Sequence, residues 1–314
     1  MSILSYLTKK ERFQIVAASL YFSIDILLGT GILIMMIDML TMIAGGNGYF
    51  DNLYLYWLAI GGVLVIKALM NCQADLKKHK AGFDITERIR ISMIHKLKKF
   101  SLGFYTKERL GEVSTIIHKD VDTLESVAAH LWSRMLGDMI VTLIIGIYLA
   151  FTNLTMFIGM IALLPIGIFI LVKGIQKNIQ MEKANKSAQM DMVSLFVEFA
   201  KGIPLLKAFQ ESKDFENRLM ESTKAFGSTS KKISTHIAAY IGKYLLCLEM
   251  SYAIMLMVGI YGLINGSVTL TEFLIFSMVS KEFYKPFASL ESHFINYVRA
   301  EESYLRIKKI LEGN

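Results

Sequence analysis

The distribution of Lys and Arg along the chain is the feature that most constrains how it can fold. Six segments are mainly apolar and about long enough to cross a lipid bilayer: 15–43, 54–72, 133–151, 154–172, 244–264 and 268–286. No Lys or Arg occurs in the three short connections that would face one side of the membrane: 44–53, 152–153 and 265–267. Thirty of the 34 Lys and Arg residues lie in four other places: before residue 13, in 73–130, in 173–243 and after 286. This asymmetry is typical of a multi-spanning membrane protein with both termini and two long loops in the cytoplasm.

Composition supports the same class. Hydrophobic residues make up 54% of the chain and charged residues only 19%, below the fraction of about 25% that is usual in soluble domains. The first apolar segment does not read as a cleavable signal peptide, because it is too long and carries Asp25 and Asp38. The net charge of +7 lies on the cytoplasmic loops, where it sets topology and meets anionic lipid. We therefore expect a protein integral to a bacterial plasma membrane and no nucleic-acid partner.

The sequence contains no pattern that predicts catalytic residues or a metal site. Its two cysteines, Cys72 and Cys247, fall near the cytoplasmic ends of expected spans, so no disulfide is expected. The six histidines are scattered, and the spacing of 16 positions from His79 to His95 does not match a metal-ligand spacing.

Each long loop has apolar residues at helical spacing, so we expect helices and not disordered segments. The first stripe is Ile85, Ile89, Met93 and Leu97. The second is Ile175, Ile179, Ala184, Ala188 and Met192, continuing to Leu195 and Phe199. We expect the spans to continue into the cytoplasm as helices, about 40 Å for 27 residues, that form the two hairpins 73–130 and 173–243.

The tips of these hairpins can be located from their turn residues. The first elbow follows Ser101-Leu102-Gly103, and the second follows Gly202-Ile203-Pro204. They are either solvated turns or handles for a cytoplasmic partner, and their distance from the membrane favours handles, since a purely structural loop would be shorter. The candidate contact residues are Tyr105, Thr106, Lys107, Glu108, Arg109, Phe209, Gln210, Glu211, Ser212 and Lys213.

Ionisable residues inside expected spans are costly and are candidates for a polar substrate cavity: Asp25, Lys67, Glu249, Lys281 and Glu282. The alternative is that they pair with one another and only stabilise the bundle. Adjacent residues do not share a helix face, so at most one of Lys281 and Glu282 is expected to point into a cavity.

Two further features belong to the spans. Arg134 and Asp138 are four residues apart and predict an interfacial ion pair. Pro165 and Pro286 predict bends in the fourth and sixth spans.

Several stretches together resemble a known family. These are Gly103-Phe104-Tyr105 with Arg109-Leu110-Gly111-Glu112-Val113, then Lys119-Asp120-Val121-Asp122, then Glu198 to Phe209, and the tail Arg299-Ala300-Glu301-Glu302 to Arg306-Ile307. In this order and topology they resemble the transmembrane domain of exporter-type ABC transporters, over essentially the whole chain. Lys119 stands where that family usually has Asn. The expected fold is all-α, with six transmembrane helices, long cytoplasmic extensions and a domain-swapped dimer.

The resemblance implies partners as well as a fold. A second transmembrane domain, identical or not, would receive the fourth and fifth helices, and each elbow would be a coupling helix on a nucleotide-binding domain that holds MgATP. The chain has no G-x-x-x-x-G-K-[ST] phosphate loop, so ATP hydrolysis is expected from a fused domain after Asn314 or from a separate chain. A fused domain is the more usual arrangement in such proteins.

The sequence leaves the substrate and the direction of transport open. Export of an amphipathic small molecule, lipid or peptide is the usual activity of this type of transporter. Gly202-Ile203-Pro204, Leu124-Glu125 followed by His130, and Phe283-Tyr284-Lys285-Pro286 more weakly resemble a subgroup that includes siderophore importers. An importer of anionic chelates would need net positive groups such as Lys67 and Lys281 in its cavity. A membrane scaffold or receptor without transport is the alternative from another class.

Overall fold

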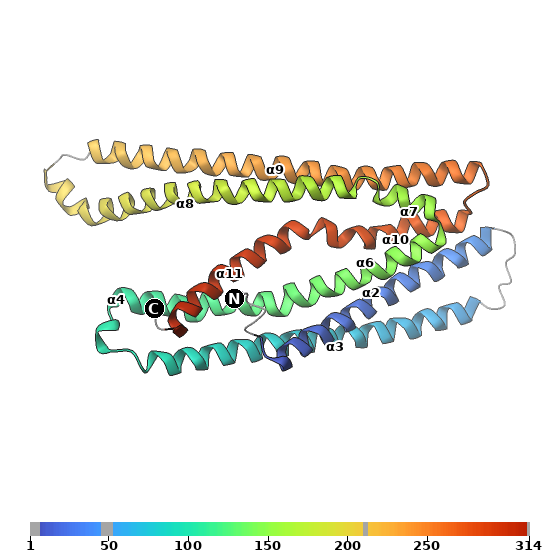
Figure 1. Cartoon of the computed structure of the whole chain (residues 1–314), viewed down its shortest axis with the longest axis horizontal. Coiled ribbons are helices and arrows are strands. Elements are labelled where there is room, and N and C mark those ends of the chain that lie inside the picture. Colours follow the sequence, from blue (N-terminus) through green and yellow to red (C-terminus); the bar gives the residue numbers. More distant parts are fainter. Residues whose placement is uncertain (1–6, 45–52, 210–212, 313–314) are drawn as a thin grey trace. The chain divides into compact units, whose positions relative to one another are not determined.

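The computed structural model describes residues 7–44, 53–209 and 213–312, and helices account for nearly all of them (Figure 1). The all-α prediction is therefore confirmed for this part of the chain. In chain order the helices are α2 (Lys9–Ala44), α3 (Leu53–Leu97), η2 (Leu102–Phe104), α4 (Lys107–Thr115), η3 (Ile116–Asp120), α5 (Val121–Ser126), η4 (Val127–Trp132), α6 (Ser133–Thr152), α7 (Leu154–Ile161), α8 (Leu164–Phe209), α9 (Lys213–Ile264), α10 (Leu270–Ala288) and α11 (Leu290–Glu312). The segments η3 and η4 are π-helical, and they join α4, α5 and α6 end to end.

The chain divides into two compact units. One comprises Met1–Ile158 and Met255–Asn314, and the other comprises Gly159–Ile254. The second unit is built from α8 and α9, which run antiparallel along one another (Figure 1).

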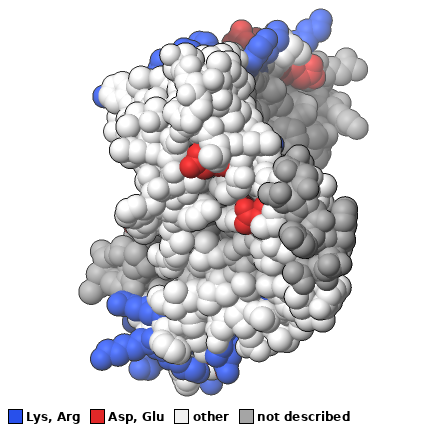
Figure 2. All heavy atoms as spheres, turned by 90° about the vertical axis from the view of Figure 1, so that its right-hand side faces the viewer, with Lys and Arg blue, Asp and Glu red and all other residues white. Residues whose placement is uncertain are grey.

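Five helical stretches are long and apolar enough to cross a membrane: Lys9–Ile43, Tyr54–Leu97, Arg109–Thr152, Leu154–Pro204 and Lys213–Ile264. The expected sixth span falls in α10, which is not among these five. Its 19 residues include Glu272, Lys281, Glu282 and Lys285, more charge than a typical span carries. Figure 2 faces the end where α6 finishes and α10 begins. In this view Lys and Arg appear only at the margins.

Two of the short turns are described in full. Asn153 is extended after α6, and its side-chain oxygen accepts a hydrogen bond from the Met156 amide at 3.2 Å. Gly266 has a φ of 69°, a conformation that favours glycine. Thr269 and Glu272 then form a reciprocal capping box that starts α10.

The first apolar stripe of the long loops is buried, as predicted. Ile85, Ile89 and Met93 of α3 are 0–3% exposed, and Leu97 packs against the same cluster. The cluster joins four stretches that are distant in sequence, with members that include Leu7, Ile15, Val121, Leu124, Ala300, Tyr304 and Ile307. This core fixes the first hairpin, the start of α2 and the end of α11 to one another.

The start of α2 is also tied to α3 by polar contacts. Glu11 is 3% exposed, and both its carboxylate oxygens accept hydrogen bonds from the Arg88 guanidinium at 3.0 Å. Thr8 and Glu11 cap each other reciprocally at 2.7 and 3.3 Å. Burial alone would raise the pKa of Glu11, but Arg88 and Thr8 hold it below its ordinary value.

The second stripe was wrong at two positions. Ile179 is 41% exposed and Ala184 is exposed, whereas Ala188, Met192, Leu195 and Phe199 are half-buried as expected. The register against α9 is set instead by Asn185, whose side-chain oxygen accepts hydrogen bonds from Thr229 and Ser230 at 2.7 and 3.0 Å. Asn185, a polar residue, thus makes the contact with α9 that the apolar pattern had predicted for its neighbour Ala184.

Both expected proline bends coincide with interruptions of the helices. The break between α7 and α8 precedes Pro165, and the Leu163 amide there donates to the buried Ser251 hydroxyl at 3.1 Å. α10 ends two residues after Pro286, and the Ser289 hydroxyl donates to the Pro286 carbonyl at 3.1 Å. Serine side chains satisfy backbone groups at both breaks, as helices in lipid require.

We predict that Ile89→Ala destabilises the protein by about 2–5 kcal/mol, because it leaves a cavity in a fully buried cluster. Ile91→Ala is the matched control, since Ile91 lies on the same helix and is 47% exposed. Thermal unfolding of the purified protein measures both. Equal losses of stability in the two variants would contradict the assignment of this core.

Candidate functional site

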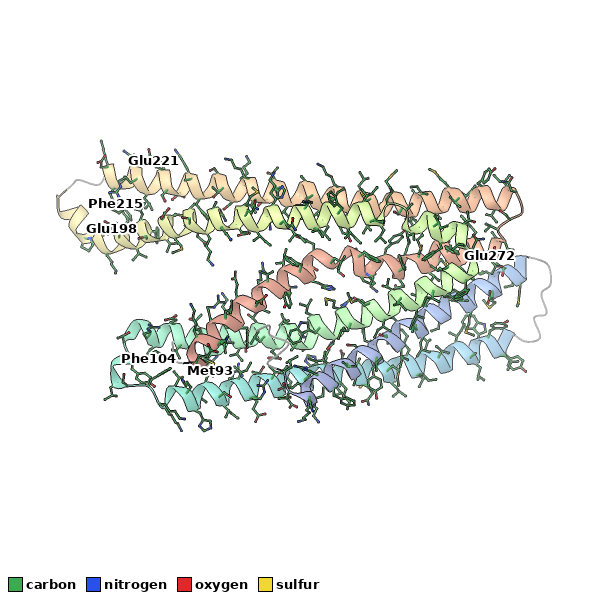
Figure 3. The ribbon with its side chains drawn as sticks, viewed as in Figure 1. Met93, Phe104, Glu198, Phe215, Glu221 and Glu272 are labelled. Atoms are coloured by element: carbon green, nitrogen blue, oxygen red, sulfur yellow. The ribbon has the colours of Figure 1, made fainter. Side chains whose placement is uncertain are left out.

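The first elbow lies between the end of α3 and the start of α4. Phe104 stacks on Phe100 with ring centroids 4.4 Å apart, and Tyr105 meets Phe104 edge-on at 5.5 Å. The Tyr105 hydroxyl donates to the Leu97 carbonyl at 2.6 Å, which ties the turn back to α3. Figure 3 shows Phe104 beside Met93 at the elbow end of this hairpin. The aromatic residues therefore attach the elbow to the buried core.

The charged part of this elbow is the start of α4. The Thr106 hydroxyl accepts a hydrogen bond from the Arg109 amide at 3.2 Å and caps the helix. The Arg109 guanidinium lies 5.5 Å from the Phe104 ring centroid and 3.4 Å from Glu112. The structure thus brings Tyr105, Thr106 and Arg109 together. Lys107 and Glu108 open α4, and their side chains lie outside the described part.

Asp120 fixes the helix beyond this elbow to α11. Its carboxylate accepts hydrogen bonds from the Arg306 guanidinium at 2.7 and 2.8 Å and from the Ser303 hydroxyl at 3.0 Å. Asp120 is 3% exposed, and its hydrogen bond raises the pKa of Arg306. Asp120 and Arg306 both lie in the stretches that resemble the family, but their pairing was not predicted from the sequence. A bidentate contact of this kind holds orientation as well as distance.

The second elbow is only partly described. Phe209 ends α8 and Lys213 begins α9 as an exposed residue, whereas the predicted contacts Gln210, Glu211 and Ser212 lie outside the described residues. Close to this end Phe199 of α8 stacks on Phe215 of α9 with ring centroids 5.7 Å apart. Phe215 is labelled in Figure 3. Two helices joined in this way carry the elbow at the tip of the second unit.

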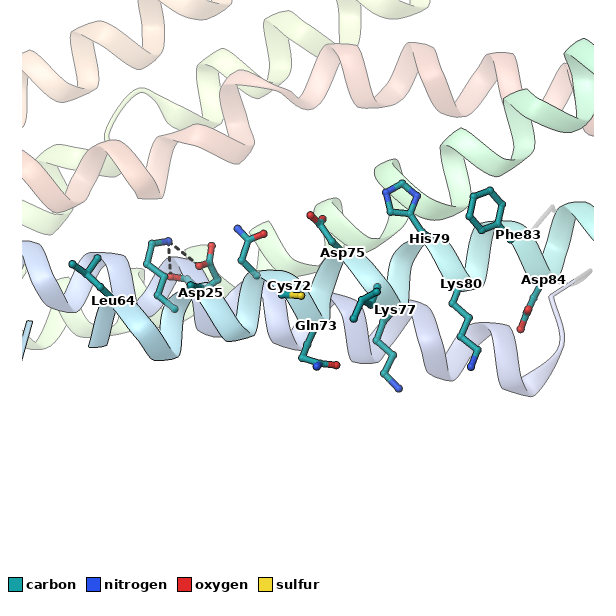
Figure 4. Close-up of a pocket in the computed structure, with 14 residues that line it drawn as sticks. Asp25, Leu64, Cys72, Gln73, Asp75, Lys77, His79, Lys80, Phe83 and Asp84 are labelled. Atoms are coloured by element: carbon teal, nitrogen blue, oxygen red, sulfur yellow. Dashed lines mark hydrogen bonds and ion pairs between the residues drawn. The ribbon is translucent and has the colours of Figure 1, made fainter. Parts of the chain in front are cut away.

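Two of the five intramembrane charges form an ion pair. Lys67 Nζ lies 2.8 Å from Asp25 Oδ1 and 3.3 Å from the Asp25 carbonyl oxygen (Figure 4). Asp25 is 5% exposed, while the Lys67 side chain is 32% exposed. The pair borders a groove of about 1190 Å³ along α3. Its lining contains three lysines and three aspartates: Lys67, Lys77, Lys80, Asp25, Asp75 and Asp84.

The two other charged candidates in the first unit do not join this pair. Glu282 is half-buried and lies 3.2 Å from Lys285, while its neighbour Lys281 is exposed. Glu249 belongs to the second unit, where it is exposed. Of the candidates in the first unit, the structure therefore brings only Asp25 and Lys67 together.

A second polar cavity was not predicted from the sequence. It has a volume of about 410 Å³, and its lining includes His130, Arg134, Asp138, Lys285 and His293. The predicted pair of Arg134 and Asp138 is confirmed, although Nε and Oδ2 are 3.9 Å apart, longer than a hydrogen bond. Burial and then Arg134 lower the pKa of His293, so its imidazole is neutral at pH 7. The signal that could have found this cavity was the charge of Asp138 in an apolar span.

We predict that Asp120→Asn destabilises the protein by about 1–3 kcal/mol, because Arg306 and Ser303 lose a charged acceptor. Asp122→Asn is the control: Asp122 pairs with Arg90 at 2.7 Å, but both side chains are 40% or more exposed, so about 0–1 kcal/mol is expected. Thermal unfolding compares the two. An equal loss in both variants would show that the buried pair does not hold α11.

Comparison with known families identifies a family to which this chain is similar. The profile of the family described as the ABC transporter transmembrane region matches residues 13–287. The match begins in α2 and ends in α10, so it includes both hairpins and both elbows.

Proposed function

The chain belongs to the ABC transporter transmembrane region family, and we propose that it exports an amphipathic small molecule, lipid or peptide by alternating access. Membership makes it the transmembrane component of an ABC transporter and an integral membrane protein. The observation that carries the mechanistic proposal is the first elbow, which is fixed to a buried core by Tyr105 and exposes charged residues. A rigid attachment of this kind transmits force from a partner to the spans.

We further propose six spans, with α10 as the sixth, and both termini in the cytoplasm. Support comes from the buried core of the first hairpin. It contains Leu7 near one end of the chain and Ile307 near the other, together with Ile89 of α3. With five spans the two ends would lie on opposite sides of the membrane, so a sixth crossing is needed to bring α11 back.

The proposed partners follow from the family. A second transmembrane domain, identical or different, would pair with this one as a domain-swapped dimer. Nucleotide-binding domains would hold MgATP and receive the two elbows, and their closure on ATP would turn the cavity from inward-facing to outward-facing. The residues proposed to contact them are those predicted at the two elbows. Support comes from Tyr105 and Arg109, which both lie against the Phe104 ring, and from Thr106, which caps the helix that carries Arg109.

The charges around Lys67 support export more than import of an anionic chelate. An importer of such chelates would present uncompensated cations, but Lys67 is neutralised by Asp25. The groove beside the pair has equal numbers of lysines and aspartates. A surface with balanced charge and apolar walls suits an amphipathic compound better than a strongly anionic one.

We predict that Tyr105→Ala abolishes substrate-stimulated ATP hydrolysis in the complete transporter while basal hydrolysis persists, because the elbow loses its bond to α3. Replacing Glu211, Ser212 and Lys213 by glycine should do the same at the second elbow. Tyr54→Ala is the control, since Tyr54 is an exposed tyrosine at the opposite end of α3. Unchanged stimulation in both elbow variants would argue either for a non-transport role as a scaffold or receptor, or for coupling contacts at other residues than these elbows.

Direction is tested in proteoliposomes with ATP supplied on one side only. We expect a labelled amphipathic dye to accumulate in vesicles whose nucleotide-binding domains face outward. A labelled ferric siderophore should not leave vesicles of the same orientation. ATP-driven loss of the chelate from preloaded vesicles would identify an importer and overturn the export proposal.

A further inference from the structure

A small polar cavity lies in the first unit where three expected spans have their cytoplasmic ends. Its volume is about 260 Å³, and its walls come from α2, α3, η4 and α6. Polar and charged side chains supply most of the lining: Asn71, Asp75, Lys78, His130, Ser133 and Arg134. This depth corresponds to the head-group layer of the inner leaflet, if the spans are placed as proposed.

Ser133 is the residue of this lining whose hydrogen bonding is incomplete. The residue is 4% exposed, and its hydroxyl oxygen is fully buried without a hydrogen-bond partner in the described part of the chain. Ser19 and Ser23 on the facing helix α2 instead donate to the carbonyls four residues earlier at 2.8 Å. Leaving a buried hydroxyl unsatisfied is costly, so a polar ligand at this position is favoured.

The cavity wall also contains a cation, Arg134, whose paired carboxylate does not line the cavity. The Arg134 guanidinium lies 5.7 Å from the Phe22 ring centroid, which fixes its position at the wall. Its nearest described carboxylate is that of Asp138 at 3.9 Å, which lines a different cavity. Lys78 is paired with Asp75, so the two cations and one carboxylate of the lining leave an excess of one positive charge.

The remaining lining residues fit an anion better than a cation. Burial, followed by the charge of Lys78, lowers the pKa of His130, so its imidazole is neutral at pH 7 and can donate one N–H. Asn71 can donate through its amide. No group of three or more His, Cys, Asp or Glu in the described residues could hold a metal ion. His130 also lies in the π-helical segment η4, and such segments are frequent at functional sites.

We propose that this cavity binds a phosphate-type oxyanion, supplied by the head group of an inner-leaflet phospholipid. Ser133, Arg134 and Lys78 would donate to its oxygens, and its single negative charge would balance the excess charge of the lining. Basic pockets between membrane helices on the cytoplasmic side recognise lipid head groups by this chemistry. The site does not depend on the substrate or direction proposed above.

The test is thermal unfolding of the purified protein in an uncharged detergent, titrated with phosphatidylglycerol, with diacylglycerol or with inorganic phosphate. We expect phosphatidylglycerol to raise the melting temperature of the unmodified protein, and the other two to have little effect. Ser133→Ala should bind the phospholipid about tenfold more weakly, because one hydrogen bond to a charged group is lost. Without lipid its melting temperature should be unchanged or higher, since the removed hydroxyl has no protein partner.

Charge variants separate a specific site from general attraction to anionic lipid. Lys78→Gln and Arg134→Gln should weaken phosphatidylglycerol binding, whereas Lys77→Gln should not, because the adjacent Lys77 lines the groove and not this cavity. Equal weakening by Lys77→Gln and Lys78→Gln would overturn the proposal. So would a rise in melting temperature with inorganic phosphate that matches the rise with phospholipid, which would identify a free anion as the ligand. The absence of any rise with phospholipid would show that only water fills the cavity.

Discussion

Asp120 and the apolar side chains around it hold together segments that are far apart in the sequence. The carboxylate binds Arg306 and Ser303 of α11, while Val121 and Leu124 on the next turn pack against α3 and α11. A buried carboxylate is tolerated only where hydrogen bonds satisfy it, and here it accepts three. Because the same cluster includes residues near both ends of the chain, it sets the position of α2, α3 and α11 at once. The first elbow is therefore attached to this buried cluster.

The two helices of the second hairpin are held together by different contacts. Between residues 175 and 232, none of the residues whose burial is described is fully buried. Its two helices are aligned by Asn185 with Thr229 and Ser230, and by the stacked rings of Phe199 and Phe215. Its stiffness must come mainly from the continuous backbone bonding of α8 and α9, with 46 and 52 residues. A hairpin without a core of its own fits the proposal that a second transmembrane domain covers it.

The sequence predicted local features well because each depends on a few neighbouring residues. Helical stripes, the turns at Asn153 and Gly266, and the family were all accessible from pattern and spacing. Contacts between residues that are far apart in the sequence could not be predicted, since nothing in the pattern relates Asp120 to a residue 186 positions later. The stripe was wrong at Ile179 and Ala184 because one polar contact set the register. Ser133 was overlooked because a serine in a span is unremarkable until its hydroxyl is found without a partner.

We propose that both long hairpins consist of continuous helices that hold the elbows in fixed positions. Hydrogen exchange of the intact protein in a lipid bilayer tests it most directly. The account predicts that backbone amides of 85–93 exchange slowest, and that those of 185–199 are slower than in an unfolded chain but faster than the first group. Exchange of either stretch at the rate of an unfolded peptide would contradict it.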